Sequence, residues 1–347
     1  MSDQHKIAVV ILNWNGRHWL EKFLPLTIKY SKEVAQVYVI DNASTDDSIS
    51  FLSSHFPEVE IIINKSNLGF AAGYNAGLKQ IKSRYYVLLN SDVEVTPYWL
   101  SGMTDVLDRS GNVAAVQPKI LSYDRKDLFE YAGAAGGYID RFGYTFCRGR
   151  VFNAIEQDRG QFDEEHNIFW GSGACLMIRS NVYHKLGGLD PDFFAHMEEI
   201  DLCWRIHHIG MKVTYCPSST IYHVGGGTLS QTNPKKTYLN FRNNLIMLYK
   251  NLTQKRMFQI VLYRMLLDGL AGVLAIYQRR FKDFVAIIKA HWSFLGGFSK
   301  WKRKRNRTKE LCNGKMIDLN GIDGYYPKSV VWQYFFKRNK SYDSLDN

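Results

Sequence analysis

The chain has 347 residues, of which 46% are hydrophobic and 14% aromatic. This length and composition suffice for one large or about two smaller globular domains with a sizeable core, and they exclude a disordered chain. The net charge of +11 is unevenly distributed, because acidic residues outnumber basic ones up to residue 229 and basic residues dominate from residue 230 onward.

The five cysteines lack the spacing of a zinc site or a redox motif, so we expect reduced thiols. MSDQHK leads directly into IAVVILNW, which is too short and too β-branched for an export signal, so we expect a cytosolic protein.

Up to about residue 92 the sequence alternates strand and helix patterns, which is typical of an α/β fold with a mostly parallel sheet covered by helices. Strands are predicted at residues 6–14, 34–42, 59–65 and 85–92, and helices at residues 17–31, 46–56 and 73–81. Each predicted strand has Asn or Asp at or next to its carboxyl end. Because ligands of open parallel sheets bind at the carboxyl ends of the strands, we expect one polar edge that forms a site, made of Asn13, Asn15, Asp41, Asn42, Asn90 and Asp92.

Two common nucleotide-binding motifs are absent from this region. No glycine-rich turn follows the first predicted strand, and the sequence has no phosphate loop that ends in Lys-Ser or Lys-Thr. Dehydrogenase and nucleoside triphosphatase functions are therefore disfavoured. The glycine-rich stretch at residues 67–78 opens a helix, although its glycines alone could serve close packing.

A cluster of acidic residues lies in AHMEEIDLCWRIHHIG, residues 195–210. Acidic side chains are favoured at the start of a helix by the helix dipole, so the cluster alone could be a solvated or ion-paired helix start. On a helix, Glu198, Asp201 and Arg205 share one face at spacings of three and four, whereas Glu199 points elsewhere. One carboxylate, Glu199, is thus a candidate for chemistry.

The C-terminal part is helical and basic. From about residue 260 to 298 the pattern is helical, and a stripe of Phe281, Phe284, Val285, Ile288, Trp292 and Leu295 could face either the core or a membrane interface. Arg264 and Asp268 interrupt the preceding apolar stretch, which we expect to prevent it from spanning a bilayer easily. The basic run KWKRKRNRTK at 300–309 could be a solvated loop, a nucleic-acid patch or a site for anionic lipid.

Seven ordered blocks between about Lys6 and Asn251 resemble family-2 glycosyltransferases, in particular the rhamnosyltransferase-like branch that builds bacterial surface polysaccharides. The blocks are VVILNWNG (9–16), VIDNASTDDS (39–48), NLGFAAGYNAGL (67–78), LLNSDVEV (88–95), GSGACLMIRS (171–180), GGLDPDFFAHMEEIDLCWRIHHIG (187–210) and IYHVGGGT (221–228). The resemblance implies a GT-A fold over residues 1–250, with residues 251–347 as a basic, amphipathic helical extension near the membrane. It also implies a nucleotide-sugar donor, a divalent metal, and an inverting transfer without a covalent intermediate.

The resemblance assigns roles to individual residues. The predicted donor-binding residues are Asn13, Asn15, Asp41, Asn42, Ser44, Asn67, Gly69, Asn75 and Asn90, of which Asn75 could instead only tie its loop together. The predicted metal site, for Mg²⁺ or Mn²⁺, consists of Asp92, His223 and, as a helper, Glu94. Asn90 replaces the first aspartate of the family's Asp-any-Asp motif, which puts this metal site in question.

The catalytic assignment follows the same resemblance. Glu199 is the predicted general base, at a position where the family usually has aspartate, and Glu198 and Asp201 would orient the acceptor or pair with Arg205. A single base suits transfer, whereas glycoside hydrolysis requires two flanking carboxyl groups. The acceptor would lie against Trp170, Gly171 and Gly173, although Trp170 could be a plain core residue.

The predicted partners are a dTDP- or UDP-sugar donor, a saccharide or polyprenyl-linked acceptor, and an anionic membrane surface at the inner face of the cell membrane. Two other functions compete with this prediction. One is an inactive, glycosyltransferase-like binding module, which the departures at Asn90 and Glu199 favour. The other is nucleic-acid binding through the basic run, which the lack of an aromatic platform or recognition-helix signature disfavours.

Overall fold

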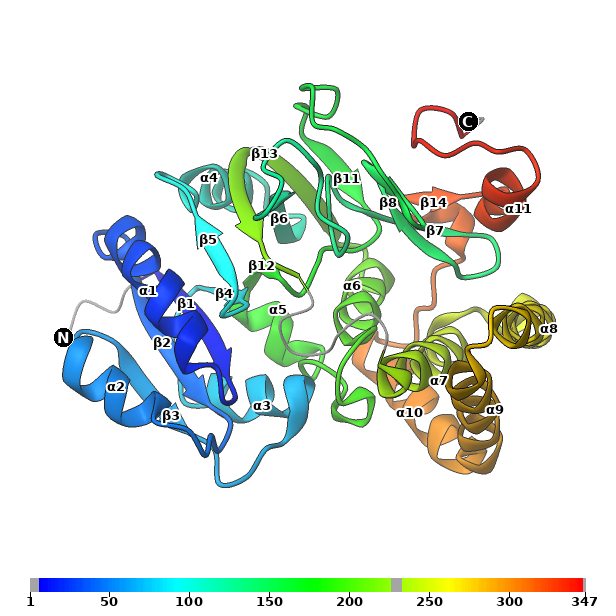
Figure 1. Ribbon diagram of the computed structural model, residues 1–347, viewed down its shortest axis with the longest axis horizontal. Coiled ribbons are helices and arrows are strands. Elements are labelled where there is room, and N and C mark those ends of the chain that lie inside the picture. The colour runs from blue at the N-terminus through cyan, green and yellow to red at the C-terminus, as the bar shows by residue number, and fades with distance from the viewer. Residues whose placement is uncertain (1–5, 226–232, 346–347) are drawn as a thin grey trace.

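The computed structural model describes residues 6–225 and 233–345 as a central sheet with helices on both faces and a group of helices at one side (Figure 1). The strands of the central sheet are β1 Ile7–Asn13, β2 Ala35–Asp41, β3 Glu60–Ile63, β4 Tyr85–Leu89, β5 Val93–Val95, β6 Val113–Ser122, β11 His166–Ile168, β12 Cys175–Arg179 and β13 Lys212–His223. The helices that cover it are α1 Arg17–Ser31, α2 Ser48–His55, α3 Gly69–Leu78, α4 Ser101–Arg109, α5 Ser180–Lys185 and α6 Glu198–His208.

The central sheet has the order β11-β13-β6-β12-β4-β1-β2-β3, and β5 pairs with β13. It is parallel from β3 to β4, as predicted, and mixed beyond, because β12 runs antiparallel to both β4 and β6. The four strands and three helices predicted up to residue 92 are all present, with ends shifted by a few residues. Because β1, β2 and β4 run parallel, their carboxyl ends lie at one edge, and the polar residues that follow them meet there.

Apolar side chains from alternate strand positions form two cores, one on each face of the central sheet. One core joins Val9 and Val87 to residues of α1, α2 and α4, such as Leu24 and Met103. The other joins Val10 to residues of α3, α5 and α6. The acidic helix α6 is therefore fixed beneath the second face by its apolar residues, which places its N-terminus at a defined point near the carboxyl edge.

A second sheet of short strands has the order β10-β9-β8-β7-β14. Its strands are β7 Gly137–Asp140, β8 Thr145–Cys147, β9 Arg150–Val151, β10 Ala154–Ile155 and β14 Tyr325–Tyr326. The last of these comes from the C-terminal segment and pairs in parallel with β7. The C-terminal residues thus take part in a sheet as well as in helices.

The long helices that follow lie together beyond α6 (Figure 1). They are α7 Pro234–Asn251, α8 Gln254–Tyr277, α9 Phe281–Gly296 and α10 Phe298–Leu311. The short helix α11 Val330–Phe335 lies apart from them, near β14 (Figure 1). The helix α7 packs against α8, α9 and α10, so elements on both sides of the predicted boundary at residue 250 form one helical layer. That boundary stays a prediction.

The basic run at 300–309 is not a solvated loop but part of the helix α10. Trp301, Arg305 and Thr308 are buried on its inner face. Lys300 and Lys304 pair with Asp192, and Lys304 also pairs with Asp190, in the turn before α6. A part of the basic charge is therefore neutralised within the protein.

One helix among the described residues is long and apolar enough to cross a membrane by length and composition, namely α8 over Arg256–Tyr277. From the sequence we expected Arg264 and Asp268 to interrupt this apolar stretch. They do not break the helix, because they pair with each other on its buried side. Only about one third of this stretch is buried inside the protein.

Candidate functional site

The first part of the site is a hydrogen-bonded cluster where β1 and β2 end. The Asn13 amide donates to Asp41 Oδ1 (3.1 Å) and to Ser44 Oγ (3.2 Å), and the Ser44 backbone N–H donates to Asp41 Oδ2 (2.9 Å). The Asn15 backbone N–H donates to Ser44 Oγ (2.9 Å). The sequence correctly predicted that these residues meet. Asp41 is fully buried, so it holds the Ser44 turn in place, and its direct contact with a nucleotide stays a prediction.

The asparagines after β2 and before α3 form a second cluster. The Asn42 amide donates to Asn67 Oδ1 (3.0 Å) and to the Gly69 carbonyl (3.1 Å), and the Gly69 N–H donates to Asn67 Oδ1 (2.9 Å). Gly69 has φ +77°, and a Cβ there would lie 2.5 Å from the Phe194 ring, so only glycine fits this position. The turn at 67–69 is thereby fixed beside the loop that precedes α6.

Asn75 does not join the other asparagines. Its amide donates to the Leu189 carbonyl (2.7 Å), while its Oδ1 accepts hydrogen bonds from the Leu189 N–H (3.0 Å) and the Tyr183 hydroxyl (2.6 Å). These bonds tie α3 to the Gly-Gly-Leu-Asp turn. The structure therefore favours the second role considered for Asn75, which is to tie its loop together, over the role of a donor-binding residue.

The predicted metal residues Asp92 and His223 lie together at the ends of β4 and β13. His223 Nε2 lies 3.2 Å from Asp92 Oδ1, and its Nδ1 lies 3.4 Å from Glu130 Oε1. The Asn90 amide nitrogen is 3.4 Å from His223 Nε2. Burial alone would lower the pKa of His223, but the carboxylates of Glu130 and Asp92 raise it to about 10.

This arrangement fits a divalent cation that takes further ligands from a diphosphate. No group of three or more His, Cys, Asp or Glu residues with metal-site geometry occurs in the described part of the chain. However, Mg²⁺ and related cations are often held by one or two carboxylates together with substrate phosphates. A cation would displace the Nε2 proton that the neighbouring carboxylates otherwise retain. Glu130 behind Nδ1 would then fix the tautomer in which Nε2 faces the cation, as carboxylates behind metal-bound histidines commonly do.

Glu94 is not part of this group, contrary to the prediction. In the pairing of β5 with β13, Val93 is opposite His223 whereas Glu94 is opposite Tyr222. Because neighbouring strand residues point to opposite faces, Glu94 faces away from His223, and it pairs with Lys126. Asp92 lies before the first residue of β5, so this alternation does not apply to it, and its carboxylate reaches His223.

The acidic start of α6 contains two kinds of carboxylate. Glu198 and Glu199 each have one buried carboxylate oxygen without a hydrogen-bond partner among the described residues. Burial raises the pKa of Glu199 to about 7. Burial and the neighbouring Glu199 charge raise the pKa of Glu198 well above its ordinary value. Near neutral pH, Glu199 thus titrates, beside a second carboxyl group whose pKa is also raised.

Asp201, in contrast, has partners at both of its carboxylate oxygens. It is fully buried, pairs with Arg205 (2.9 Å) and Lys250 (2.9 Å), and accepts a hydrogen bond from the Asn251 amide (2.8 Å). Of the two roles predicted for Asp201, the structure shows the pairing with Arg205. Glu198 does not take part in any ion pair described by the structure, so its predicted pairing with Arg205 is wrong: the guanidinium is occupied by Asp201 and the Leu186 carbonyl.

The turn before α6 holds these carboxylates in place. Phe194, His196 and Met197 all have positive φ, between +64° and +75°, which is costly for residues other than glycine. The amide of Asn243, a buried residue of α7, donates to the carbonyls of Phe193, Ala195 and His196. One side chain thus stabilises the strained turn that leads to Glu199.

The predicted acceptor loop contributes one residue beside Glu199. A Cβ on Gly173 would lie 3.9 Å from the Glu199 Cβ and 3.4 Å from the Phe70 ring, so glycine leaves space next to the base. Trp170 is 3% exposed and donates to the Tyr138 carbonyl (3.0 Å), which makes it a core residue and not an acceptor platform. Gly171 is also buried, with the Leu176 side chain 2.6 Å from its hypothetical Cβ.

Comparison with known proteins decides the family. The profile of the family described as Glycosyl transferase family 2 matches residues 8–187, which is more than half of the chain. The chain belongs to this family.

A curated relative and two solved structures are similar to this chain, and the two structures bear on its fold. N-acetylglucosaminyl-diphospho-decaprenol L-rhamnosyltransferase of Mycobacterium tuberculosis is 25% identical over 235 residues, which cover 62% of this chain and 75% of that protein. Residues 1–349 of S. aureus TarS in complex with UDP-GlcNAc align with TM-score 0.55 and 12% identity, over 89% of this chain and 92% of that one. GalNAc-T7 with UDP, GalNAc and Mn²⁺ aligns with TM-score 0.57 and 15% identity, over 73% of this chain and 49% of that one. The predicted GT-A fold is confirmed.

In this family-2 glycosyltransferase, sequence reasoning missed three residues that shape the site. Glu130 contacts His223, Asn64 donates to Asn42 Oδ1 (3.1 Å), and Asn243 holds the turn before α6. Glu130 and Asn243 lie outside the seven recognised blocks, so no motif marked them. Asn64 ends a strand pattern like Asn13 and could have been found by that rule. The Gly-Gly-Thr residues at 226–228 of the last block lie outside the described residues.

Proposed function

We propose that this glycosyltransferase moves a sugar, with L-rhamnose as the first candidate, from a dTDP- or UDP-sugar to an acceptor hydroxyl with inversion. The observation that carries the proposal concerns Glu199: one of its buried carboxylate oxygens has no hydrogen-bond partner among the described residues, and its Cβ lies 3.9 Å from the place that a Cβ on Gly173 would occupy. A general base works best when its pKa is near the working pH, and the Glu199 pKa of about 7 meets this requirement.

In the proposed reaction the acceptor hydroxyl donates a hydrogen bond to Glu199, which removes its proton as the oxygen attacks the anomeric carbon. The bond from that carbon to the nucleoside diphosphate breaks on the opposite face, so the configuration inverts in one step. A bound divalent cation would supply neutralisation of the charge on the diphosphate. Asp92 and His223 would hold the cation, and Asn90, Asn13 and Asn42 would line the donor side.

The proposed acceptor is a saccharide carried on a polyprenyl diphosphate at the inner face of the cell membrane. One relative is named as a rhamnosyltransferase that acts on a diphospho-decaprenol, and this name supports both the sugar and the lipid carrier. The competing proposal of an inactive binding module predicts donor binding without turnover. Release of free nucleoside diphosphate from the donor would reject it.

Thermal shift with nucleoside diphosphates tests the proposal. Ligands that bind only the folded state raise its melting temperature. We expect dTDP or UDP to raise the melting temperature more than GDP does, and Mn²⁺ to enlarge that shift. Asp92→Asn should abolish the Mn²⁺-dependent part, whereas Glu94→Gln, a control on the other face of β5, should retain it. The proposal is rejected if none of the three nucleotides shifts the wild-type protein, with or without Mn²⁺.

A further inference from the structure

The helix α8 has its polar and apolar sides reversed relative to a soluble surface helix. Its two internal charged residues, Arg264 and Asp268, are 7% and 1% exposed and pair with each other. Arg264 also stacks on the Tyr144 ring and donates to the Gly143 carbonyl, and His291 of α9 lies 3.5 Å from Asp268. Charged residues that point into the protein and pair there are typical of helices in contact with lipid.

The outer side of α8 is correspondingly apolar. At 100° per residue, its exposed apolar side chains cover roughly half of the helical circumference. These side chains are Phe258, Leu262, Tyr263, Leu266, Leu270, Val273, Leu274, Ile276 and Tyr277, each between 39% and 86% exposed. A continuous apolar patch of this kind marks an interaction surface.

The helix α9 extends the same surface. Most of its predicted stripe is exposed, which answers the question left open by the sequence, because a core-facing helix would bury it. The exposed residues are Phe281, Val285, Ile288, Trp292 and Leu295. Ala286, Ile287, Ala290 and Phe294 fill the inner face instead. Phe284 is the exception in the stripe, since its ring lies near Gly272 of α8.

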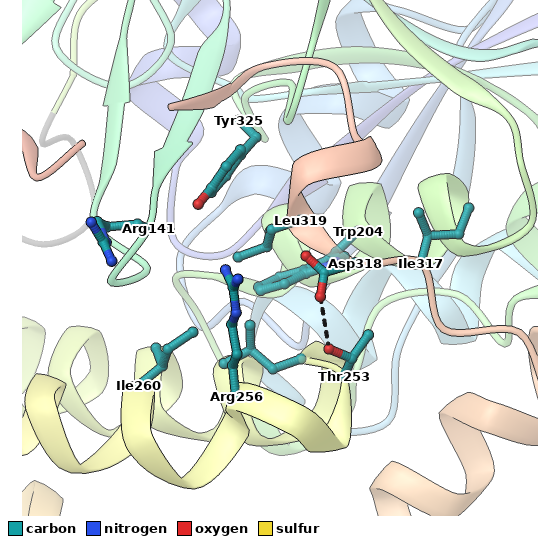
Figure 2. Close-up of a pocket in the computed structure, with 10 residues that line it drawn as sticks. Arg141, Trp204, Thr253, Arg256, Ile260, Ile317, Asp318, Leu319 and Tyr325 are labelled. Atoms are coloured by element: carbon teal, nitrogen blue, oxygen red, sulfur yellow. Dashed lines mark hydrogen bonds between the residues drawn. The ribbon is translucent and has the colours of Figure 1, made fainter. Parts of the chain in front are cut away.

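The borders of this surface are basic. Arg256 lies at one end of α8, Arg279 and Arg280 lie in the turn to α9, and Lys282 and Lys289 flank the α9 stripe, all of them exposed. Among the described residues of α8 and α9, no acidic side chain is fully exposed, since Asp268 is buried and Asp283 pairs with Arg280. Near the start of α8, Arg256 and Tyr325 point toward each other across a small pocket with Arg141 at its edge (Figure 2).

We infer that the exposed apolar residues of α8 and α9, called here the α8–α9 face, lie in the plane of an anionic membrane surface with their side chains in the lipid. Helices with one apolar side and basic borders bind in this way. The inference deepens the membrane location included in the proposed function. It also assigns the contact to α8 and α9 and not to the basic run at 300–309, because lysines of α10 are paired with Asp190 and Asp192.

An in-plane position follows from the inner side of α8. A helix that crosses the bilayer would have to leave the protein, whereas Arg264 binds Gly143 and Tyr144 of the transferase part. A second copy of the chain is a poorer occupant, because a symmetric contact would bring basic borders of like charge together. Anionic lipid complements these borders.

Vesicle binding of the full chain tests the inference. We expect the wild-type protein to sediment with vesicles of phosphatidylcholine and phosphatidylglycerol and to remain largely bound at high salt, because apolar insertion is not screened. Leu266→Glu combined with Leu270→Glu should lower the bound-to-free ratio at least about tenfold. The control Val34→Glu introduces a charge at another exposed apolar residue and should bind like wild type. Equal binding of the double variant and wild type overturns the inference.

Two further measurements test the alternatives to in-plane membrane binding, namely a dimer contact through this face and a helix α8 that spans the bilayer. If the face is a dimer contact, the double variant will lower self-association in sedimentation velocity without changing vesicle binding, and the inference is wrong. If α8 spans the bilayer, a cysteine introduced by Gln278→Cys will be protected from a membrane-impermeant maleimide added outside intact vesicles. We expect it to be labelled, with little background because the five native cysteines are buried. A Leu270→Cys variant with an environment-sensitive dye should show a blue shift with vesicles even if the charged variants fold poorly.

The outcome is distinguishable from that of the proposed function. Vesicle binding needs no nucleotide, so a protein that binds vesicles but no dTDP, UDP or GDP would reject the proposed function and retain the inference. A protein that binds a nucleotide but does not bind vesicles would reject the inference and retain the proposed function.

Discussion

Two groups of buried carboxylates lie within about one helical turn of each other at the start of α6, and they are opposite in character. Glu198 and Glu199 have oxygens without partners, and burial raises the pKa values of both. Asp201 is surrounded by Arg205, Lys250 and Asn251. Although burial alone would raise its pKa, Lys250 and Arg205 lower it.

The difference teaches that position on the helix decides whether a carboxylate is available for chemistry. Asp201 faces α7, where Lys250 joins it and Arg205 in an ion-pair network that holds the helix in place. The Cβ of Glu199 lies near Gly173, which has no side chain, and one carboxylate oxygen of Glu199 has no partner among the described residues. A carboxylate left without partners in a buried position is destabilising, and such positions are frequent at functional sites.

The largest expected effect is on transfer when the unpaired carboxylate is removed. Glu199→Gln should lower the rate of transfer by about 10²- to 10⁴-fold, because the general base is lost while size and packing are kept. The measurement is initial-rate formation of glycosylated acceptor at saturating donor. Glu198→Gln is the matched control, since it makes the same substitution at the neighbouring buried carboxyl group and keeps the proposed base, and we expect its rate to fall less than about tenfold. Near-normal transfer by Glu199→Gln would end the assignment of the base.

The next effect is on stability and concerns the paired group. Asp201→Asn leaves Lys250 and Arg205 without a full counter-charge in a buried place, and we expect it to cost about 3 kcal/mol of unfolding free energy. Chemical denaturation gives the value, and transfer per folded molecule should change little. Combining it with Lys250→Met should recover part of the loss, because one of the unpaired cations is then absent. A stability loss at Glu199→Gln as large as that at Asp201→Asn would contradict the comparison.

The pH dependence should separate the two groups without any mutation. Glu199 must be ionised to act, so transfer should fall about tenfold per unit below a pH of about 7. Folding raises the pKa of Glu199. This residue therefore contributes most to stability at a pH below the ordinary pKa of glutamate, and the contribution is lost as the pH rises through about 7. Asp190 and Asp201 have lowered pKa values. Their contribution to stability is therefore present at a pH above the ordinary pKa of aspartate and is lost as the pH falls below it. A pH–rate profile and melting temperatures at each pH check that activity is lost well before the fold.

The first part of the fold was predictable because its signals are local. Four strands, of which β1, β2 and β4 are largely buried, and the helices between them have continuous apolar runs or clear periodicity, and all were placed to within a few residues. The helix α3 begins at Gly69, before the predicted start at 73, because a glycine-rich stretch can be helical when packing against Phe194 fixes it. The second sheet was missed because strands of two to four residues carry no pattern, and β14 pairs with β7 from a distant part of the chain.

The site was predictable as a gathering of residues, but the direction of each side chain was not. The carboxyl-edge rule brought Asn13, Asp41 and Asn42 together correctly. It could not show that Glu94 faces Lys126, because this follows from the register of β5 against β13. In the same way, a helical pattern gives α9 an apolar stripe without saying whether protein or lipid covers it.

The smallest expected effect concerns the length of the unpaired side chain. Glu199→Asp restores the residue usual in the family, but it withdraws the carboxylate by one methylene from the space left by Gly173. A shift on the order of 1 Å in a positioned group weakens catalysis, so transfer should fall, although by less than in Glu199→Gln, because a base remains. The measurement is the pH–rate profile of both variants: Glu199→Asp should keep a sigmoidal dependence on pH, with its midpoint displaced, whereas Glu199→Gln should lose that dependence. If the two variants have the same rates and the same profile, the length and the charge of residue 199 do not matter separately, and the base must be sought among the other carboxylates at this edge, beginning with Glu198.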